Sequence, residues 1–223
     1  MKKVIALILM ILTVVSLTAC ASTGTHDLAN PDRASKYSDN YAKLTTEYGE
    51  AEFKEDAEYG TVLTGVAVMR ILEFSGDSKP ELYIAYSDGT KPYANKQQIY
   101  GFDNGPYEFF SEYKENLDMS EITTKSSADK KGPCICLYTD EDGLAYLVVG
   151  EDLSKQADYY SYVTVDSNGD EIYNLVKIFT EYDGKQLPGK YEYIELTGLT
   201  KADAEKIFEE NENVINSIES QKK

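Results

Sequence analysis

The fold class is decided by residues 134–149, which read CICLYTDEDGLAYLVV. Two short runs rich in aliphatic and aromatic residues flank the dipeptide Asp142-Gly143. Such runs favour strands, and Asp-Gly supplies the positive φ angles that a tight antiparallel turn needs. The stretch therefore predicts two antiparallel strands joined by a turn.

The same pattern continues on both sides of this stretch. Three more hairpin dipeptides occur at 104–105, 168–169 and 183–184. Runs rich in Val, Ile, Leu, Tyr and Phe predict strands at 62–74, 82–86, 98–102, 107–110, 134–138, 144–149, 159–165, 172–180 and 190–196. A polar gap at 120–131 predicts a loop. The sequence thus indicates an antiparallel β-meander, either an open sheet or a partial barrel.

A helix is expected at each end of this meander. Asn30 offers an N-cap, Pro31 a first helical position and Gly49 a stop. At the other end, Thr200 and Asp203 have the spacing of a capping box. Apolar or aromatic residues at helical spacing follow both starts: Tyr37, Tyr41, Leu44 and Tyr48, then Ala204, Ile207, Phe208, Val214, Ile215 and Ile218. The predicted class is α+β.

Composition restricts the partners. The chain has 39 acidic and 22 basic residues and a formal net charge of −17. This acidity argues against binding nucleic acid and favours cations, either metal ions or basic protein segments. There are 19 Tyr and no Trp. Tyrosines suit the faces of strands, and stacking on sugars is the alternative.

The N-terminus has the pattern of an export signal. Lys2 and Lys3 precede the apolar stretch 4–17, which is about 14 residues long and shorter than the ~20 of a spanning helix. The segment closes with Leu17-Thr18-Ala19-Cys20. Without Lys2 and Lys3 the net charge of −17 becomes −19.

The Leu17–Cys20 segment resembles the lipobox of bacterial lipoproteins. The resemblance implies cleavage before Cys20, lipid on its sulfur, and an extracytoplasmic protein held at the cell membrane by that lipid. We therefore expect a signal peptide at 1–19, a lipidated cysteine and flexible tether at 20–31, and one α+β domain at 32–223. The alternative is an ordinary signal peptide with a cysteine at this place.

One segment has metal-binding character. Residues 73–82, EFSGDSKPEL, resemble the Asp-rich calcium loop of integrin-type β-propeller repeats and of many exported bacterial lipoproteins. The resemblance implies oxygen ligands from the positions of Glu73, Ser75, Asp77, the Lys79 carbonyl and Glu81. Ser78 replaces a glycine of the pattern, and the Lys79 ammonium can serve as an internal counter-charge. A turn without metal is the alternative, and no other cofactor is expected.

A wider resemblance covers about residues 1–110. The lipobox, the Tyr-rich first helix, Thr64-Gly65-Val66-Ala67 and Ile99-Tyr100-Gly101-Phe102 are similar to small lipoproteins of Gram-positive bacteria that have no assigned activity. The resemblance therefore implies location and fold, and it brings no substrate.

Several enzyme classes are disfavoured. His26 is the only histidine and lies in the tether, which argues against Ser-His-Asp sites, Cys-His sites and histidine-bound zinc. Cys134 and Cys136 are expected to be small buried thiols, with a strained disulfide as the alternative. The hypotheses are a non-catalytic module that binds an envelope protein or glycan, an envelope hydrolase with paired carboxylates, and a calcium-responsive adhesion or stability module.

Overall fold

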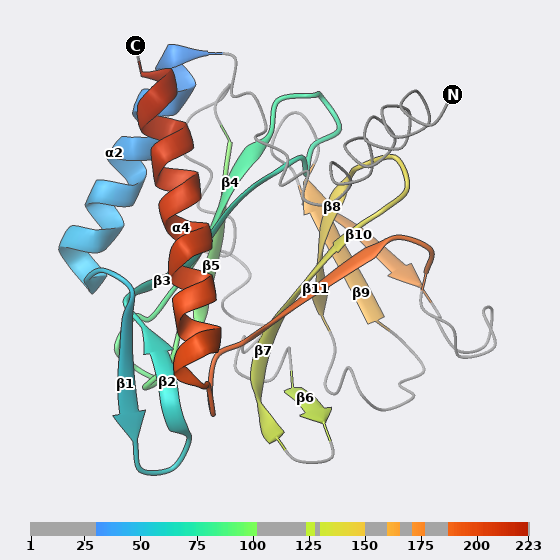
Figure 1. The fold of residues 1–223 in the computed structure, drawn as a ribbon. Coiled ribbons are helices and arrows are strands. Elements are labelled where there is room, and N and C mark those ends of the chain that lie inside the picture. Colours follow the sequence, from blue (N-terminus) through green and yellow to red (C-terminus); the bar gives the residue numbers. More distant parts are fainter. Residues whose placement is uncertain are drawn as a thin grey trace, which may run out of the picture.

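The computed structural model describes residues 30–101, 124–127, 130–149, 160–165, 171–176 and 187–222. It confirms the α+β class, with a helix at each end of the antiparallel strands (Figure 1). The elements are α2 (Pro31–Tyr48), β1 (Glu52–Asp56), β2 (Gly60–Thr64), β3 (Val66–Leu72), β4 (Glu81–Tyr86), β5 (Lys96–Tyr100), β6 (Thr124–Ser127), β7 (Lys130–Thr139), β8 (Ala145–Val149), β9 (Tyr160–Val165), β10 (Glu171–Val176), β11 (Lys190–Glu195) and α4 (Lys201–Gln221).

The strands form three antiparallel groups. β1 pairs with β2, and β3, β4 and β5 form a second sheet in that order. The largest sheet has the order β10-β9-β8-β7-β11, with β6 also paired to β7. The run from β7 to β10 is the predicted meander, and it forms an open sheet. β11 returns across the sheet to pair with β7.

The three-stranded sheet is the middle layer of the molecule. On one face, Leu82 and Ile84 of β4 pack with residues of α2 and α4. On the other face, Tyr83 and Ala85 pack with residues of β7, β8 and β11. Every residue of β4 is therefore buried. This layering explains why β4 reads as a continuous apolar run with one charged residue, Glu81, at its start.

Both helices begin where the sequence predicts. The Asn30 side chain accepts a hydrogen bond from the Asp32 N–H, Pro31 opens α2, and Gly49 follows its last residue at φ 86°. At α4 the side chains of Thr200 and Asp203 form the expected capping box. Ser38 of α2 contacts Glu219 near the end of α4, so the helices run antiparallel (Figure 1).

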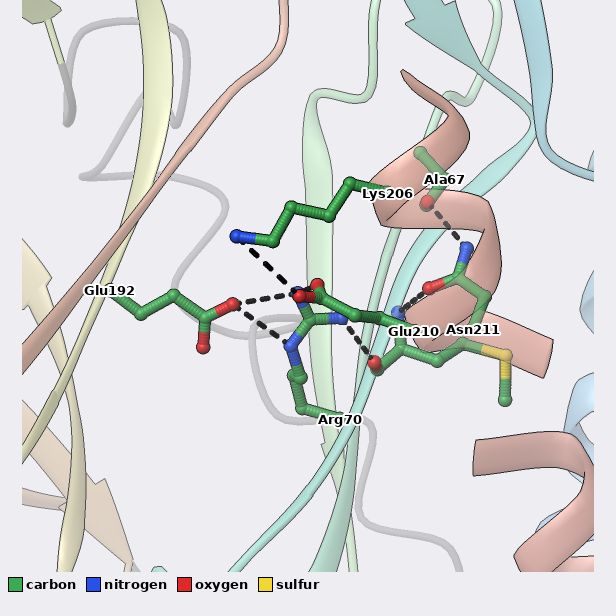
Figure 2. A network of polar contacts seen from close by, with 7 residues as sticks. Ala67, Arg70, Glu192, Lys206, Glu210 and Asn211 are labelled. Carbon is green, nitrogen blue, oxygen red and sulfur yellow. Dashed lines mark hydrogen bonds and ion pairs between the residues drawn. The ribbon is translucent and has the colours of Figure 1, made fainter. Parts of the chain in front are cut away.

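A buried asparagine joins α4 to β3. The Asn211 Oδ1 accepts a hydrogen bond from the Met69 N–H at 2.9 Å, and its Nδ2 donates to the Ala67 carbonyl at 2.8 Å (Figure 2). The register of β3 against β4 shifts between Val66 and Val68, beside these bonds. Asn211 thus satisfies the strand backbone at a bulge, where an unpaired buried group is costly.

An ion-pair network lies next to this bridge. Arg70 of β3 contacts the carboxylates of Glu192 on β11 and Glu210 on α4, and Lys206 lies 3.8 Å from the second carboxylate (Figure 2). The Arg70 side chain is 11% exposed. A guanidinium suits this place because it can serve two carboxylates in fixed directions. One side chain therefore connects all three layers.

Some predicted elements need correction. The strand predicted at 62–74 is divided by Gly65, whose φ is 71°. A side chain there is impossible, because a Cβ would lie 1.9 Å from the Glu50 carbonyl oxygen. The predicted loop at 120–131 contains β6, whose polar residues gave no apolar signal. β10 and β11 are not neighbours in the sheet, and the Asp183-Gly184 dipeptide between them lies outside the described residues.

Other expectations have different outcomes. Cys134 and Cys136 are buried thiols that form no disulfide with each other, as expected. The Asp142-Gly143 turn is present, with Gly143 at φ 90°. β9 and β10 pair on either side of Asn168-Gly169, although that dipeptide lies outside the described residues. The strand predicted at 107–110, the dipeptide at 104–105 and the export signal also lie outside them.

The Asn211 bridge makes a quantitative prediction. Asn211→Ala leaves the Met69 N–H and the Ala67 carbonyl without partners, so the free energy of unfolding should fall by about 2–4 kcal/mol. Urea denaturation measures this. Asn213→Ala, an exposed position on the same helix, should change stability by less than about 0.5 kcal/mol. Equal losses in both variants would contradict the bridge.

Candidate metal centre

The loop between β3 and β4 is held in place at three points. Phe74 is fully buried in the core between the two larger sheets. The Pro80 carbonyl accepts a 2.8 Å hydrogen bond from the Tyr37 hydroxyl of α2. The Glu73 carbonyl accepts a 2.6 Å hydrogen bond from the Ala145 N–H at the start of β8. The loop is thus tied to a helix and to each neighbouring sheet.

The acidic side chains organise the loop backbone. Glu73 Oε1 accepts hydrogen bonds from the Asp77 N–H at 3.1 Å and from the Ser75 hydroxyl at 3.3 Å. Asp77 Oδ1 accepts one from the Lys79 N–H at 2.9 Å. Glu81 Oε2 accepts one from the Phe74 N–H at 2.7 Å. Each carboxylate therefore holds part of the turn, which brings the three together.

The backbone keeps the conformation of a glycine-rich loop. Gly76 has φ 74°, and Ser78 has φ 64°. Ser78 is the only residue other than glycine with positive φ in the part of the chain that the structure describes. Its position is the one where the calcium-loop pattern has its second glycine. Ser78 therefore adopts a backbone conformation that favours glycine, at the cost of some backbone strain.

Three carboxylates converge inside this turn. One oxygen from each of Glu73, Asp77 and Glu81 lies within 4.8 Å of the other two. Among the described residues, the one ion-pair partner of this group is the Lys79 ammonium, at 3.4 Å from Asp77 Oδ2. Carboxylate oxygens are the preferred ligands of hard cations. This group can hold a metal ion, which would replace part of the missing positive charge.

Glu81 differs from the other two acids. It is 6% exposed. Burial raises the pKa of its carboxyl to about 7, and the charges of Glu73 and Asp77 act in the same direction. Hydrogen bonds from Phe74 and Ser75 oppose the rise. A cation at this point would favour the ionised form, so metal and proton compete for the same oxygens.

The structure brings together most of the predicted ligands. Glu73, Asp77 and Glu81 converge, and the Ser75 hydroxyl contacts Glu73. The Lys79 ammonium lies beside Asp77 as the expected counter-charge. Two contributions were missed in the sequence: the Phe74 N–H, which fixes Glu81, and Tyr37, which fixes Pro80. The Phe74 N–H lies within the loop itself, seven residues before Glu81, whereas the Tyr37 contact spans 43 residues and no local pattern indicates it.

The other positions that the sequence singled out are not part of this loop. Cys20, the predicted lipidation site, and the second acidic stretch at 166–170 lie outside the described residues. On the outer face of the large sheet, Tyr138 contacts the rings of Tyr146 and Tyr191, beside the buried Cys136. These tyrosines are side chains of strand faces, as the composition predicted.

Comparison with family models, curated proteins and solved structures found no match for this chain. Among the described residues, no helix combines the length and the apolar character that crossing a bilayer requires.

The buried glutamate predicts a pH dependence. Its pKa of about 7 in the folded protein lies above the ordinary 4.5, so the folded state holds this proton more tightly than the unfolded state. The resulting stability is complete below about pH 4.5 and is lost as pH rises through 7. With a chelator present to remove metal, the free energy of unfolding of the parent protein should therefore fall between pH 5 and pH 8. The fall should exceed that of Glu81→Gln by about 2–3 kcal/mol.

Urea denaturation of the two proteins at several pH values checks this difference. Glu212→Gln removes an exposed charge on α4 and serves as the matched control. The fall in the free energy of unfolding between pH 5 and pH 8 should persist in this variant. If the stability difference between the parent protein and Glu81→Gln did not change with pH, the pKa of Glu81 would not be raised.

Proposed function

We propose that this chain is a membrane-anchored extracytoplasmic lipoprotein that acts as a non-catalytic binding module. The observation that carries the proposal is Leu17-Thr18-Ala19-Cys20 at the end of a charged and then apolar leader. Lipid on Cys20 would hold the protein at the outer surface of the cell membrane. The ligand would be an envelope protein or glycan.

The start of the described domain suits a tether. Asn30 and Pro31 lie at the outer end of α2, and Pro31 is exposed. Residues 20–30 separate this point from the cysteine. At most ~3.5 Å per residue, they would reach about 40 Å. The domain would therefore stay close to the membrane while presenting its far end to partners.

Binding is favoured over hydrolysis because the side chains that could catalyse hydrolysis are buried or lie outside the domain. His26 is the only histidine and lies outside the domain proposed here. Cys134 and Cys136 are buried and have no histidine to activate them. A paired-carboxylate hydrolase would need an acid that reaches its substrate, whereas Glu81 is buried and engaged by a backbone N–H. Paired carboxylates remain the alternative mechanism.

A second candidate function is favoured by the loop. We propose that Glu73, Asp77 and Glu81 bind calcium weakly and that the ion stabilises the module. The convergence of three oxygens within 4.8 Å supports this. Calcium takes six to eight oxygen ligands, so backbone carbonyls and water would complete the site. Affinities of extracellular calcium modules, about 10⁻⁴–10⁻³ M, suit a site with one ligand lost.

Metabolic labelling tests the anchor. Cells fed a labelled fatty acid should label the full chain, and Cys20→Ser should abolish the label because the thioether cannot form. Cys134→Ser is the matched control and should retain the label, since that thiol is buried in the sheet. Absence of label from the parent chain, or its persistence in Cys20→Ser, would refute the anchored reading.

Thermal melting tests calcium. At about 5 mM calcium, a site with a Kd near 0.5 mM gains about 1.4 kcal/mol, which raises the melting temperature of the full chain by about 3–5 °C. Asp77→Asn should remove the rise, and the rise should be smaller at pH 6, where Glu81 is protonated.

Asp142→Asn is the matched control for this experiment. It removes one exposed acid from the neighbouring turn and should leave the calcium response intact. The calcium proposal is wrong if calcium does not raise the melting temperature of the parent protein. It is also wrong if Asp77→Asn shows the same rise as the parent and Asp142→Asn. Neither result would affect the anchor, which is tested separately.

A further inference from the structure

A second site lies at the other end of α2. A cavity of about 320 Å³ opens where this helix ends and β1 begins. Among the residues that line it are Tyr48, Gly49, Glu50, Glu52, Lys54 and Gly65. It is far from Pro31, because an 18-residue helix is about 27 Å long (Figure 1). Its volume is at the lower end of the range for ligand pockets, which suits one long side chain.

A backbone crossing gives the cavity a fixed floor. The Val66 N–H donates a 2.9 Å hydrogen bond to the Gly49 carbonyl, and Glu50 forms a parallel bridge with Val66. Gly65 lies so close to this segment that no side chain fits there. Two distant parts of the chain are thus locked together beneath the opening. The shape of the cavity does not depend on mobile side chains alone.

Negative charge surrounds the opening. The carbonyl end of α2 carries the negative end of the helix dipole, and the last turn contains no basic residue. Glu50 and Glu52 line the cavity, and no described cation forms an ion pair with Glu50. Burial and the Glu50 carboxylate raise the pKa of Tyr41. A hydrogen bond to Glu47, followed by burial, raises the pKa of Tyr48.

The ring of Tyr48, which lines the cavity, adds a second attraction for cations. The ring of Tyr48 stacks on that of Tyr86, with centroids 4.7 Å apart and planes 30° apart. Aromatic rings beside carboxylates favour ammonium and guanidinium groups. One such ammonium comes from the chain itself: Lys54 lines the cavity, and its Nζ lies 2.7 Å from Glu52 Oε2. The surroundings therefore already hold a lysine side chain.

We propose that this cavity binds a lysine or arginine side chain from a basic segment of a partner protein. The occupant follows from charge complementarity: two exposed carboxylates, the carbonyl end of a helix and the ring of Tyr48 meet at one opening. Exposed ion pairs are individually weak, so the partner needs several basic residues. This inference deepens the proposed binding function by naming the partner's chemistry, yet it requires neither lipid on Cys20 nor calcium at 73–81.

Fluorescence anisotropy tests the proposal with the full chain in detergent and chelator. The probe is a labelled hexapeptide of alternating lysine and glycine, and its acetyl-lysine counterpart keeps the shape without the charge. The lysine peptide should bind at least tenfold more tightly. Glu50→Gln with Glu52→Gln should weaken that binding at least fivefold, whereas Tyr48→Leu should weaken it at least threefold.

Two charge-matched controls separate the cavity from the general acidity of the protein. Glu209→Gln with Glu212→Gln removes two exposed charges from α4 and should change the affinity less than twofold. Lys54→Gln frees Glu52 and should tighten binding at least twofold, whereas Lys201→Gln on α4 should not. Equal losses from the two glutamate pairs, or equal gains from the two lysine variants, would overturn the proposal. Melting curves verify that each variant is folded.

Discussion

Strand β4 is buried on both faces, and much of the molecule follows from this constraint. The helices cover one side of it, and the large sheet covers the other. A strand in this position must be apolar, yet its first residue is Glu81. The carboxylate keeps a backbone N–H and a serine hydroxyl as partners, and its pKa rises. The chemistry of the loop therefore arises from the layering and not only from its acidic sequence.

The sequence anticipated features that depend on neighbouring residues. The helix starts at Pro31 and Lys201, the apolar stripes and the turn at Asp142-Gly143 are all local patterns, and the structure contains them. The resemblance to the calcium loop also named Glu73, Asp77 and Glu81, the three acids that converge in the structure. What these features share is that their hydrogen bonds join residues at most a few positions apart, so composition and spacing suffice.

Long-range features were not accessible in this way. Asn211 reads as an ordinary polar residue of a helix, although it pairs with β3 across 142 residues of sequence. The pairing of β11 with β7 skips the three strands between them, whereas turn dipeptides indicate only neighbours. Gly65 divides a long apolar run because the backbone of Glu50 passes over it. In each case the partner decides the role, and one sequence without its fold does not name the partner.

The hydrogen bond between the Tyr37 hydroxyl and the Pro80 carbonyl has a mechanical consequence. Tyr37 lies in the second turn of α2, close to Asn30, where the proposed tether would enter. Tension in such a tether would pull on this first part of the helix and then, through the tyrosine, on the segment that carries Asp77 and Glu81. The load would pass first through the buried Ala34 and then through the Tyr37–Pro80 hydrogen bond. A pull on the proposed tether would thus reach the acidic turn through a single side-chain hydrogen bond.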